Sequence, residues 1–384
     1  MHFGLITQHV GTGDGQGAIN HAVAHAALER GHAITLLATS VEADLRNHPH
    51  VQWIRITPGI GPTQLVNDQV FAWRTARWLQ AHRHRLDGVM ANGAITWSAA
   101  DVNAMHFVHG AWLRSGARVA DGRSWLHTAY HNIYSRINAA WERRALRQAR
   151  VAVAVSEMVS DQIRSLGEDV SVEVIPNGID PSVFTPNGPH VDRAAMGVPH
   201  DAPLALFVGD LQIPLKNLDT VLKAVAHVPS VHLAVAGTID DSPSPALAQR
   251  LGIATRVHFL GFRRDIPALM RTADLFVFPS RYETFSLVLL EAMASGTPVV
   301  TASTVGASDL VTPEAGVVMD DPNDTEALVH HLRRLVDAPN KRRAMGREGR
   351  SVAEQYPLSR TAHRYVDLLE RLSAETGAPA AIWR

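Results

Sequence analysis

The chain has 384 residues, too many for one hydrophobic core of ordinary size, so we expect two domains. Hydrophobic residues make up 46% and charged residues 19%, a composition typical of globular proteins. The formal net charge of −1 gives no overall field for nucleic acid, and the absence of cysteine excludes disulfides, thiolate nucleophiles and cysteine-bound metal. The opening residues MHFGLITQHV contain neither a basic leader nor a long apolar run, so we expect a soluble, cytoplasmic protein.

The first half of the chain alternates between short strand-like runs and helical segments. The run HFGLIT (2–7) is followed by the glycine-rich loop GTGDGQG (11–17), a helix that ends at Gly31, and a second strand, HAITLLAT (32–39). Alternation of this kind predicts a parallel sheet covered by helices. Further strands are expected at 51–56, 86–91, 104–109 and 151–156.

Residues 176–203 are rich in proline, glycine and asparagine, which is the composition of a linker. An amphipathic helix is predicted near the C-terminus, at 361–372. Between the two, strands are expected at 203–209, 231–237, 257–262, 275–280, 298–303 and 315–319.

This pattern predicts an α/β protein with two facing Rossmann-like domains and a cleft between them. The first domain is expected at 1–184 and the second at 185–357. The C-terminal helix, about 358–384, is expected to pack back on the first domain.

Two glutamates in RYETFSLVLLEAMASGTPVV (281–300) indicate a ligand. Glu291 lies among apolar residues, where a carboxylate loses hydration and needs a partner. A helix is expected to begin near Phe285, and its first-turn amides and dipole would form an anion site suited to a phosphate. Glu283 would precede this helix, and Glu291 would lie roughly 12 Å further along it. Hydroxyls at both glutamates and a phosphate between them describe a nucleotide-sugar.

The segment resembles the Glu-x7-Glu motif of retaining glycosyltransferases of the GT-B fold, family 4. Other runs that are similar to landmarks of that family are VIPNGID (174–180), FVGD…KN (207–217), VHFLGF (257–262) and EAMASGTPVV (291–300). The resemblance extends over nearly the whole chain. It implies an enzyme that uses a UDP- or GDP-type sugar donor and requires neither a metal nor another cofactor.

The resemblance also implies roles for single residues. Glu283 would contact donor-sugar hydroxyls, Glu291 would hold the ribose, and Lys216 would neutralise the diphosphate. The implied catalytic residues are Glu283 and His109, with His106 as the alternative to His109 because the strand register is open. The implied donor-binding residues are Gly17, Gly209, Lys216, Gly261, Phe262, Thr284, Phe285, Ser286, Leu287 and Glu291.

The chain departs from the family at Asp210. Many members carry an arginine directly after the glycine that corresponds to Gly209. An inward carboxylate would repel a diphosphate, so either Asp210 turns away or another arginine, such as Arg281, substitutes.

A dinucleotide-binding interpretation competes for the glycine loop. Gly13, Gly15 and Ala18 mimic its fingerprint, but that fingerprint expects an acidic residue after the second strand, where the chain has Thr39 and Ser40. An NAD-dependent oxidoreductase is therefore an alternative function, as is an inactive sugar-nucleotide-binding protein.

Two histidines of the first predicted helix, His21 and His25, are spaced as a metal pair. Because no third ligand is evident from the sequence, no metal site is predicted.

Basic and aromatic residues are interleaved at 71–86 and at 112–150. The first stretch has no acidic residue, and the second has eight arginines against Asp121 and Glu142. Such helices are typical of membrane-surface contacts, and lipid-linked acceptors are common in the resembled family. A solvated face with packed aromatic residues is an equally compatible interpretation.

The resemblance thus implies a retaining hexosyltransferase of cell-surface polysaccharide or glycolipid synthesis. Its expected partners are a nucleoside-diphosphate sugar and a glycan or lipid-linked acceptor, without nucleic acid. It would work in the cytoplasm, with peripheral contact to the inner face of the membrane as an option.

Overall fold

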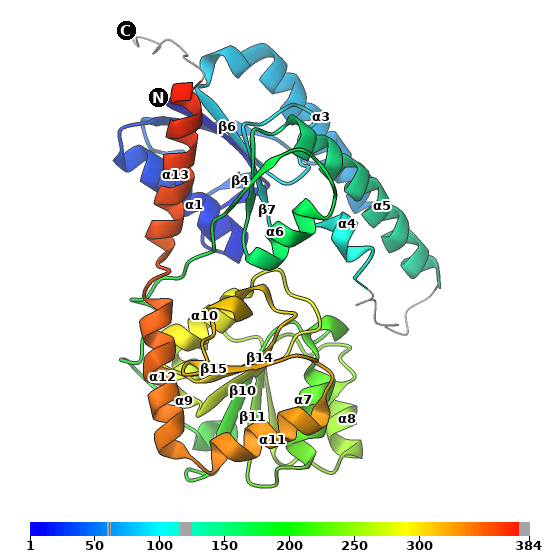
Figure 1. Ribbon diagram of the computed structural model, residues 1–384, viewed down its shortest axis with the longest axis vertical. Helices are drawn as coiled ribbons and strands as arrows, with labels where there is room; N and C mark the ends of the chain where they lie inside the picture. Colours follow the sequence, from blue (N-terminus) through cyan, green and yellow to red (C-terminus); the bar gives the residue numbers. More distant parts are fainter. Residues whose placement is uncertain (60, 62, 116–124, 376–384) are drawn as a thin grey trace. The chain divides into compact units, whose positions relative to one another are not determined.

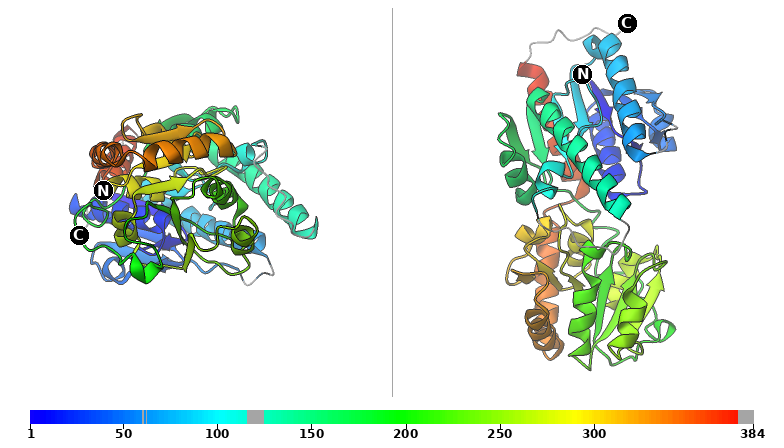
Figure 2. Two further views of the ribbon diagram at one scale, coloured as in Figure 1. Left: turned by 90° about the horizontal axis from the view of Figure 1, so that it is seen from below. Right: turned by 90° about the vertical axis from the view of Figure 1, so that its right-hand side faces the viewer.

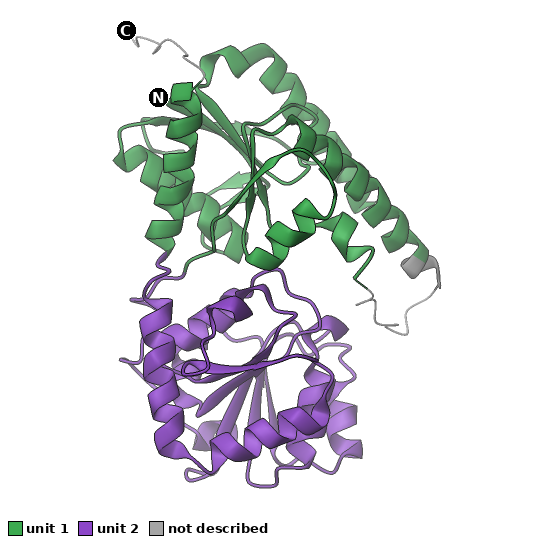
Figure 3. Cartoon of the chain, viewed as in Figure 1, with its two compact units in different colours: residues 1–116, 122–178, 358–384 green, residues 117–121, 179–357 purple. Residues whose placement is uncertain are grey.

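The computed structural model describes residues 1–59, 61, 63–115 and 125–375 of the chain (Figure 1). These residues form two compact units (Figure 3). The first unit contains the described residues of 1–178 together with 358–375, and the second contains residues 179–357. Each unit has one large parallel sheet with helices packed on it, which confirms the predicted α/β class and the two Rossmann-like domains.

The first unit is built on a seven-stranded parallel sheet of order β5-β3-β1-β6-β7-β8-β9. All five residues of β1 (His2–Ile6) are buried, as expected for a central strand covered on both faces. The remaining strands of this sheet are β3 (Ala33–Ala38), β5 (Val51–Arg55), β6 (Gly88–Asn92), β7 (Val102–Met105), β8 (Val151–Ala154) and β9 (Ser171–Val174), and the short pair is β2 (His9–Val10) with β4 (Ser40–Val41). The helical segments are α1 (Gly15–Glu29), α2 (Ala43–Arg46), α3 (Gln64–His82), η1 (Arg83–Arg85), α4 (His109–Trp112), α5 (Trp125–Gln148), α6 (Glu157–Arg164) and α13 (Leu358–Glu375).

One predicted strand of this unit was placed too late. The strand expected at 104–109 is β7, which ends at Met105, and His109 instead begins helix α4. The amides of His109 and Gly110 donate to the buried carboxylate of Glu142 on α5, which turns the chain into a helix at this point.

Helix α13 lies beside α1, although almost the whole chain separates them in sequence (Figure 1). Its apolar face is buried in the core of the first unit, with Tyr365 and Val366 at 0% exposure. Arg150 ties the end of the helix to the unit by donating to the carbonyl of Leu372 at 2.6 Å. The structure therefore places the last described helix within the first unit.

The second unit has a six-stranded parallel sheet of order β12-β11-β10-β13-β14-β15. Four of its strands, β10, β11, β14 and β15, are labelled in Figure 1, and Figure 2 shows the chain from two other directions. The strands are β10 (Leu204–Val208), β11 (His232–Ala236), β12 (Val257–Gly261), β13 (Leu275–Phe278), β14 (Val299–Ala302) and β15 (Gly316–Met319). The helical segments are η2 (Ala194–Met196), η3 (Pro214–Lys216), α7 (Leu218–Ala226), α8 (Ser244–Arg250), α9 (Ile266–Thr272), α10 (Leu287–Ala294), η4 (Gly306–Leu310), α11 (Thr325–Val336) and α12 (Pro339–Ala353).

The proline-rich segment that was expected as a linker is packed on this second unit from residue 179 onward. Arg193 donates to the carbonyl of Thr272 at 2.8 Å and to the carboxylate of Asp274 at 3.0 Å. The side chain of Thr272 in turn accepts the amide of Val191. These bonds explain why the segment is ordered despite its linker composition.

Among the described residues, no helix combines the length and the apolar character needed to span a membrane.

Candidate functional site

Three glycines meet at the carboxyl ends of neighbouring strands β10, β11 and β12. Gly237 donates to the carbonyl of Gly261 at 2.9 Å, and a Cβ on Gly237 would lie only 1.9 Å from the carbonyl oxygen of Gly209. Positive φ angles of 155° at Gly237 and 66° at Gly261 also favour glycine. Parallel sheets bind ligands at the carboxyl ends of their strands. At this end of the sheet, the glycines would offer a ligand backbone groups and no side chains. Phe262 follows directly and is 73% exposed.

The loop after β10 is fastened to the loop after β13 by the buried side chain of Asn217. Its amide nitrogen donates to the carbonyls of Pro279 at 2.8 Å and Pro322 at 2.6 Å. Asn217 itself has a left-handed φ of 64°, a conformation that asparagine tolerates better than most residues. These bonds fix the position of the preceding residue, Lys216.

Lys216 and Glu283 are paired in the second unit. The ammonium of Lys216 donates to the carboxylate of Glu283, and both side chains keep about a fifth of their surface exposed, at 23% and 21%. The backbone of Glu283 is held by the carbonyl of Thr304 and the amide of Gly306. An incoming anion would meet a positioned cation here and would compete with Glu283 for it.

Helix α10 begins at Leu287, two residues later than predicted. The carbonyl of Phe285 accepts the amide of Ala307 at 2.7 Å, which keeps the preceding segment extended. The chain then turns at Ser286, whose φ of 83° is rare for a residue with a Cβ. Strained positions of this kind cluster at ligand sites.

The late start of α10 corrects the spacing of the two glutamates. Of the stretch between the two glutamates, only the residues from Leu287 onward are helical. Glu291 therefore lies about 6 Å along the helix axis from the start of α10. The expectation of roughly 12 Å from Glu283 applied the helical rise to the whole stretch, and that rise does not hold for residues 283–286, which precede the helix. The amides of Leu287 and Val288 come before the first hydrogen bond of the helix, as at any helix start, whereas the amide of Leu289 donates to the carbonyl of Ser286 at 3.3 Å. Phe285 is buried at 4% exposure and Thr284 is partly buried, so Phe285 offers this site only backbone.

Glu291 has a carboxylate that is mostly buried and that forms no hydrogen bond or ion pair within the described part of the chain. Burial raises its pKa from 4.5 to about 7. The three residues that follow it, Ala292, Met293 and Ala294, are buried at 1% exposure or less, which confirms the apolar surroundings expected from the sequence. A buried acid without a protein partner is a candidate for binding ligand hydroxyls.

The structure also bears on Asp210. Its carboxylate is exposed and accepts the amide of Gln212 at 3.0 Å within its own loop. Arg281 is occupied by the carboxylate of Asp219 at 2.9 Å and the carbonyl of Pro214 at 2.7 Å. The alternative in which Asp210 turns toward its own loop therefore fits this structure better than substitution by Arg281.

In the first unit, Gly17 lies in the first turn of α1. The carboxylate of Asp14 caps this helix by accepting the amide of Gly17 at 2.7 Å. A Cβ on Gly17 would lie 2.7 Å from the carbonyl oxygen of Gly11, so only glycine fits without a shift of the loop. The loop is also held by Glu42, which accepts the amide and hydroxyl of Thr12.

A buried polar network that sequence reasoning missed supports the same loop. The side chain of Asn20 donates to Thr7 at 2.8 Å and accepts from Asn92 at 2.8 Å, at the carboxyl ends of β1 and β6. No spacing rule would have found it, because the three residues are spread over about 85 positions and meet only in the fold.

His109 is the first residue of α4, and its ring contacts the rings of Phe107 and Tyr134 at centroid distances of 4.8 and 5.6 Å. Burial lowers the pKa of His109 to about 4, so its imidazole is neutral at neutral pH. Its Nδ1 atom is buried with no protein partner among the described residues. Beneath it, burial raises the pKa of Glu142 to about 7, although the amides of His109 and Gly110 oppose this shift.

His106, the alternative to His109, is also partly buried, and burial lowers its pKa to about 4. Its Nε2 atom likewise lacks a protein partner among the described residues. The structure brings Lys216 and Glu283 together and places Gly17 and His109 in the other unit.

Solved structures with the same architecture span almost the whole chain. Sucrose-phosphate synthase from Thermosynechococcus elongatus has a TM-score of 0.80 at 21% identity and covers 97% of this chain and 99% of its own. WaaG, a glycosyltransferase involved in lipopolysaccharide biosynthesis, has a TM-score of 0.74 at 23% identity, with 96% and 99% coverage. Anabaena Alr3699/HepE in complex with UDP-glucose has a TM-score of 0.70 at 21% identity, with 97% and 100% coverage. These similarities define the fold as that of the GT-B glycosyltransferases.

The sequence of the chain also matches two protein-family models, which define its family within the GT-B glycosyltransferases. Residues 13–183 match "Glycosyltransferase Family 4" and residues 190–352 match "Glycosyl transferases group 1". The chain therefore belongs to the group 1 glycosyltransferases, as the motifs at 207–217 and 283–291 predicted.

Among curated relatives, the D-inositol 3-phosphate glycosyltransferase of Mycobacterium tuberculosis is 35% identical over 228 residues, which are 56% of this chain and 46% of the relative. The matching protein of Mycobacterium bovis gives the same values. The chain thus spans about half the length of the curated relatives it matches.

Proposed function

We propose that the protein is a retaining glycosyltransferase that moves a sugar from a nucleoside diphosphate to a hydroxyl of a glycan or lipid-linked glycan. The observation that carries this proposal is the arrangement in the second unit of Lys216, Glu283, Glu291 and the first-turn amides of α10. We call this set the donor site. The UDP-glucose complex of HepE supports a nucleotide-sugar donor, and the name of the mycobacterial relatives supports glycosyl transfer.

The donor site contains the groups that departure of a diphosphate requires. Negative charge develops on the leaving oxygen, and Lys216 together with the helix-start amides stabilises it without reorganising. Glu283 is then free to accept sugar hydroxyls, because the diphosphate replaces it as the partner of Lys216. Glu291 accepts the two ribose hydroxyls, which supply the hydrogen bonds that the protein does not. The reaction as proposed needs no bound cation.

Retention means that the acceptor attacks on the face from which the diphosphate leaves. A phosphate oxygen takes the acceptor proton, so no side-chain base is obligatory. His109, neutral at working pH, supports the charge that develops at the anomeric carbon. Proton NMR of the first product from an α-linked donor should show an α linkage, and a β linkage would rule out retention.

A nucleotide-sugar panel tests the donor proposal directly. Thermal unfolding of the full chain is followed with UDP- and GDP-sugars, the free diphosphates and NAD, since binding to the folded state raises the melting temperature. One sugar-nucleotide class should raise it, and the matching diphosphate should be released when an acceptor is added.

The other outcomes of the panel separate the competing functions. Stabilisation by NAD alone would support the oxidoreductase alternative that the glycine loop raised. Stabilisation by a sugar nucleotide without release of diphosphate for any acceptor would indicate an inactive binding protein.

We also propose a role in cell-surface polysaccharide or glycolipid synthesis, at the cytoplasmic side of a membrane. The basic and aromatic helices α3 and α5 of the first unit support this location. Trp73 and Ile133 are exposed at 42% and 54%, with exposed arginines at 77 and 136 nearby in sequence. Part of the second basic stretch, residues 116–124, lies outside the described residues; it contains Arg118, Asp121 and Arg123.

A further inference from the structure

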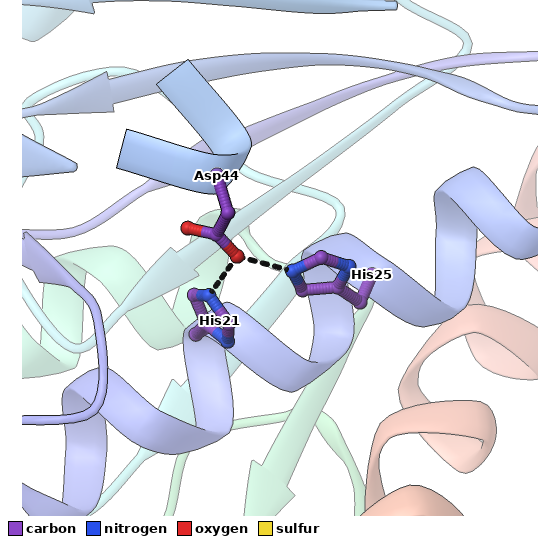
Figure 4. Close-up of side chains that lie close together, drawn as sticks. All are labelled: His21, His25 and Asp44. Atoms are coloured by element: carbon purple, nitrogen blue, oxygen red, sulfur yellow. Dashed lines mark hydrogen bonds and ion pairs between the residues drawn. The ribbon is translucent and has the colours of Figure 1, made fainter. Parts of the chain in front are cut away.

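A group of ligand-type side chains lies outside the donor site, along the middle of α1. His21 and His25 are one helical turn apart, and Asp44 lies in the first turn of the next short helix, α2 (Figure 4). One oxygen of Asp44 lies 2.8 Å from Nε2 of His21 and 2.8 Å from Nε2 of His25. Within the described residues, these three form the one group of at least three histidine, aspartate or glutamate side chains with metal-ligand spacing.

Sequence reasoning found the two histidines and missed the third residue. Asp44 is 19 positions beyond His25 and reaches it only because β3 and β4 return the chain to the side of α1. The structure therefore removes the argument against a metal site that rested on the absence of a third ligand.

The geometry leaves room for an ion. The three ligand atoms all lie within 4.8 Å of one another. A tetrahedral zinc site with bonds of about 2.0–2.1 Å needs ligand atoms about 3.3 Å apart, so the two contacts to Asp44 would lengthen by only about half an ångström. His25 and Asp44 are 40% and 47% exposed, which gives an ion access from solvent.

Charge and ligand type select the class of ion. The carboxylate of Glu42 lies 3.5 Å from Nε2 of His21, so two acidic groups face the two imidazoles. Two imidazoles and one carboxylate form a ligand set that suits Zn²⁺ and its neighbours in the late transition series. Calcium and magnesium prefer all-oxygen sites, which this group is not.

We propose that His21, His25 and Asp44 bind one divalent cation of the zinc class, with the fourth position open to water. The cation would clip α1 to α2. It belongs to the first unit, whereas the donor site belongs to the second, and it does not depend on the proposed transferase activity. Because Glu42 holds Thr12, the same segment connects the ion to the glycine loop.

The competing explanation is a hydrogen-bonded cluster in which both histidines donate to Asp44 and no ion binds. The chain also carries 21 histidines, and exposed ones bind transition metals weakly. The test must therefore separate one tight site from several weak ones.

The experiment uses the full chain freed of metal with EDTA and then exchanged into buffer without chelator. Zn²⁺ is titrated calorimetrically, and Co²⁺ is added separately to read the coordination number from its visible absorption. The variants are His25→Gln, Asp44→Asn and the matched control His330→Gln, a histidine on α11 that is exposed and lies beside another histidine.

Wild type and the His330→Gln control should bind one equivalent of Zn²⁺ at least about tenfold more tightly than any further equivalents. His25→Gln and Asp44→Asn should lose that equivalent and the accompanying rise in melting temperature, while their melting temperatures in EDTA show that they are folded. If a variant does not fold, the wild-type protein alone tests the proposal: with one equivalent of Co²⁺ added, its visible spectrum should be that of a four-coordinate ion, and a spectrum of another coordination number would contradict the site. Weak binding without a distinct first equivalent in wild type, or a first equivalent that survives both substitutions, would overturn the proposal.

Discussion

Glu291 places a carboxylate in mostly apolar surroundings, and this has opposite consequences for folding and for binding. Its pKa is raised by burial from 4.5 to about 7, so the unfolded chain releases this proton at lower pH than the folded protein does. The stability associated with the bound proton is therefore complete below about pH 4.5 and is lost as pH rises through 7. Above that pH, the ionised group costs on the order of 3 kcal/mol.

Glu291→Gln should therefore make the ligand-free protein more stable at pH 8 and weaken donor binding. The stability difference should disappear near pH 4.5, and the loss of ribose hydrogen bonds should cost about 1–3 kcal/mol of binding. Chemical unfolding at several pH values and calorimetry with the donor measure the two effects.

Glu314→Gln is the matched control, because Glu314 is an exposed carboxylate of the same unit. It should change neither quantity. Unchanged donor affinity in a folded Glu291→Gln variant would remove Glu291 from the donor site.

His109→Ala should lower turnover strongly while donor binding falls only modestly, the behaviour of a group that acts mainly in the transition state. Steady-state kinetics and donor titration of the same variant separate the two quantities. His106→Ala is the control, since both imidazoles are buried and neutral at neutral pH. Full activity of His109→Ala with a loss in His106→Ala would transfer the role to His106.

Residues that follow a linear motif can be singled out from the sequence, and their roles in the site stay predictions; residues that meet only through the fold cannot be singled out in this way. Lys216, Glu283 and Glu291 lie in short runs with recognisable neighbours. Asn217 and Gly237 act by binding or touching distant backbone, at Pro322 and Gly209. Asp44 likewise becomes relevant only where the chain returns to α1. Their roles depend on pairings that no local pattern contains.

At the scale of elements, most strands were predictable because parallel strands buried on both faces are continuous apolar runs. Strand β9 was not expected, because it is only partly buried and its sequence SVEV is not such a run. The exact residues at which helices and strands begin and end were less predictable. Helix α10 starts late because the carbonyl of Phe285 accepts a hydrogen bond from the amide of Ala307. Strand β7 ends early because the carboxylate of Glu142 accepts the amide of His109 at the start of α4. Both boundaries are set by tertiary hydrogen bonds and not by propensity.

The helices α3 and α5 carry the membrane prediction. Arg77 lies over the ring of Trp73 at 5.1 Å, and Arg144 lies over that of Trp141 at 5.6 Å. If these helices face lipid, vesicles with anionic headgroups should sediment the protein at low salt and release it at high salt. Neutral vesicles of the same size are the control. Equal sedimentation with both would favour a solvated face.

At the scale of the whole molecule, we expect turnover to survive EDTA. Lys216 and the helix-start amides neutralise the diphosphate in the proposed reaction, so the chemistry needs no cation. Loss of the cation proposed at His21 should lower the melting temperature and leave the donor site intact. Turnover that stops in EDTA and returns with magnesium or manganese would contradict this mechanism.

Deleting residues 358–384 should unfold the first unit and leave the second folded. Tyr365, Val366 and Leu369 are buried in the first unit's core, and loss of each such side chain costs about 2–5 kcal/mol. The sum is comparable with the stability of a whole domain. Limited proteolysis followed by mass spectrometry should recover a fragment near 179–357. A truncated protein that melts like the wild type would refute this.

The position of α13 has a consequence for biosynthesis. Residues 179–357 form a continuous segment and can fold as soon as they leave the ribosome. The first unit is begun earlier but lacks its last core helix until residues 358–375 have been made. We therefore expect the N-terminal half to remain incompletely folded, with part of its hydrophobic core exposed, while residues 179–357 are synthesised and fold. During synthesis, this half should be the part of the chain that chaperones bind most.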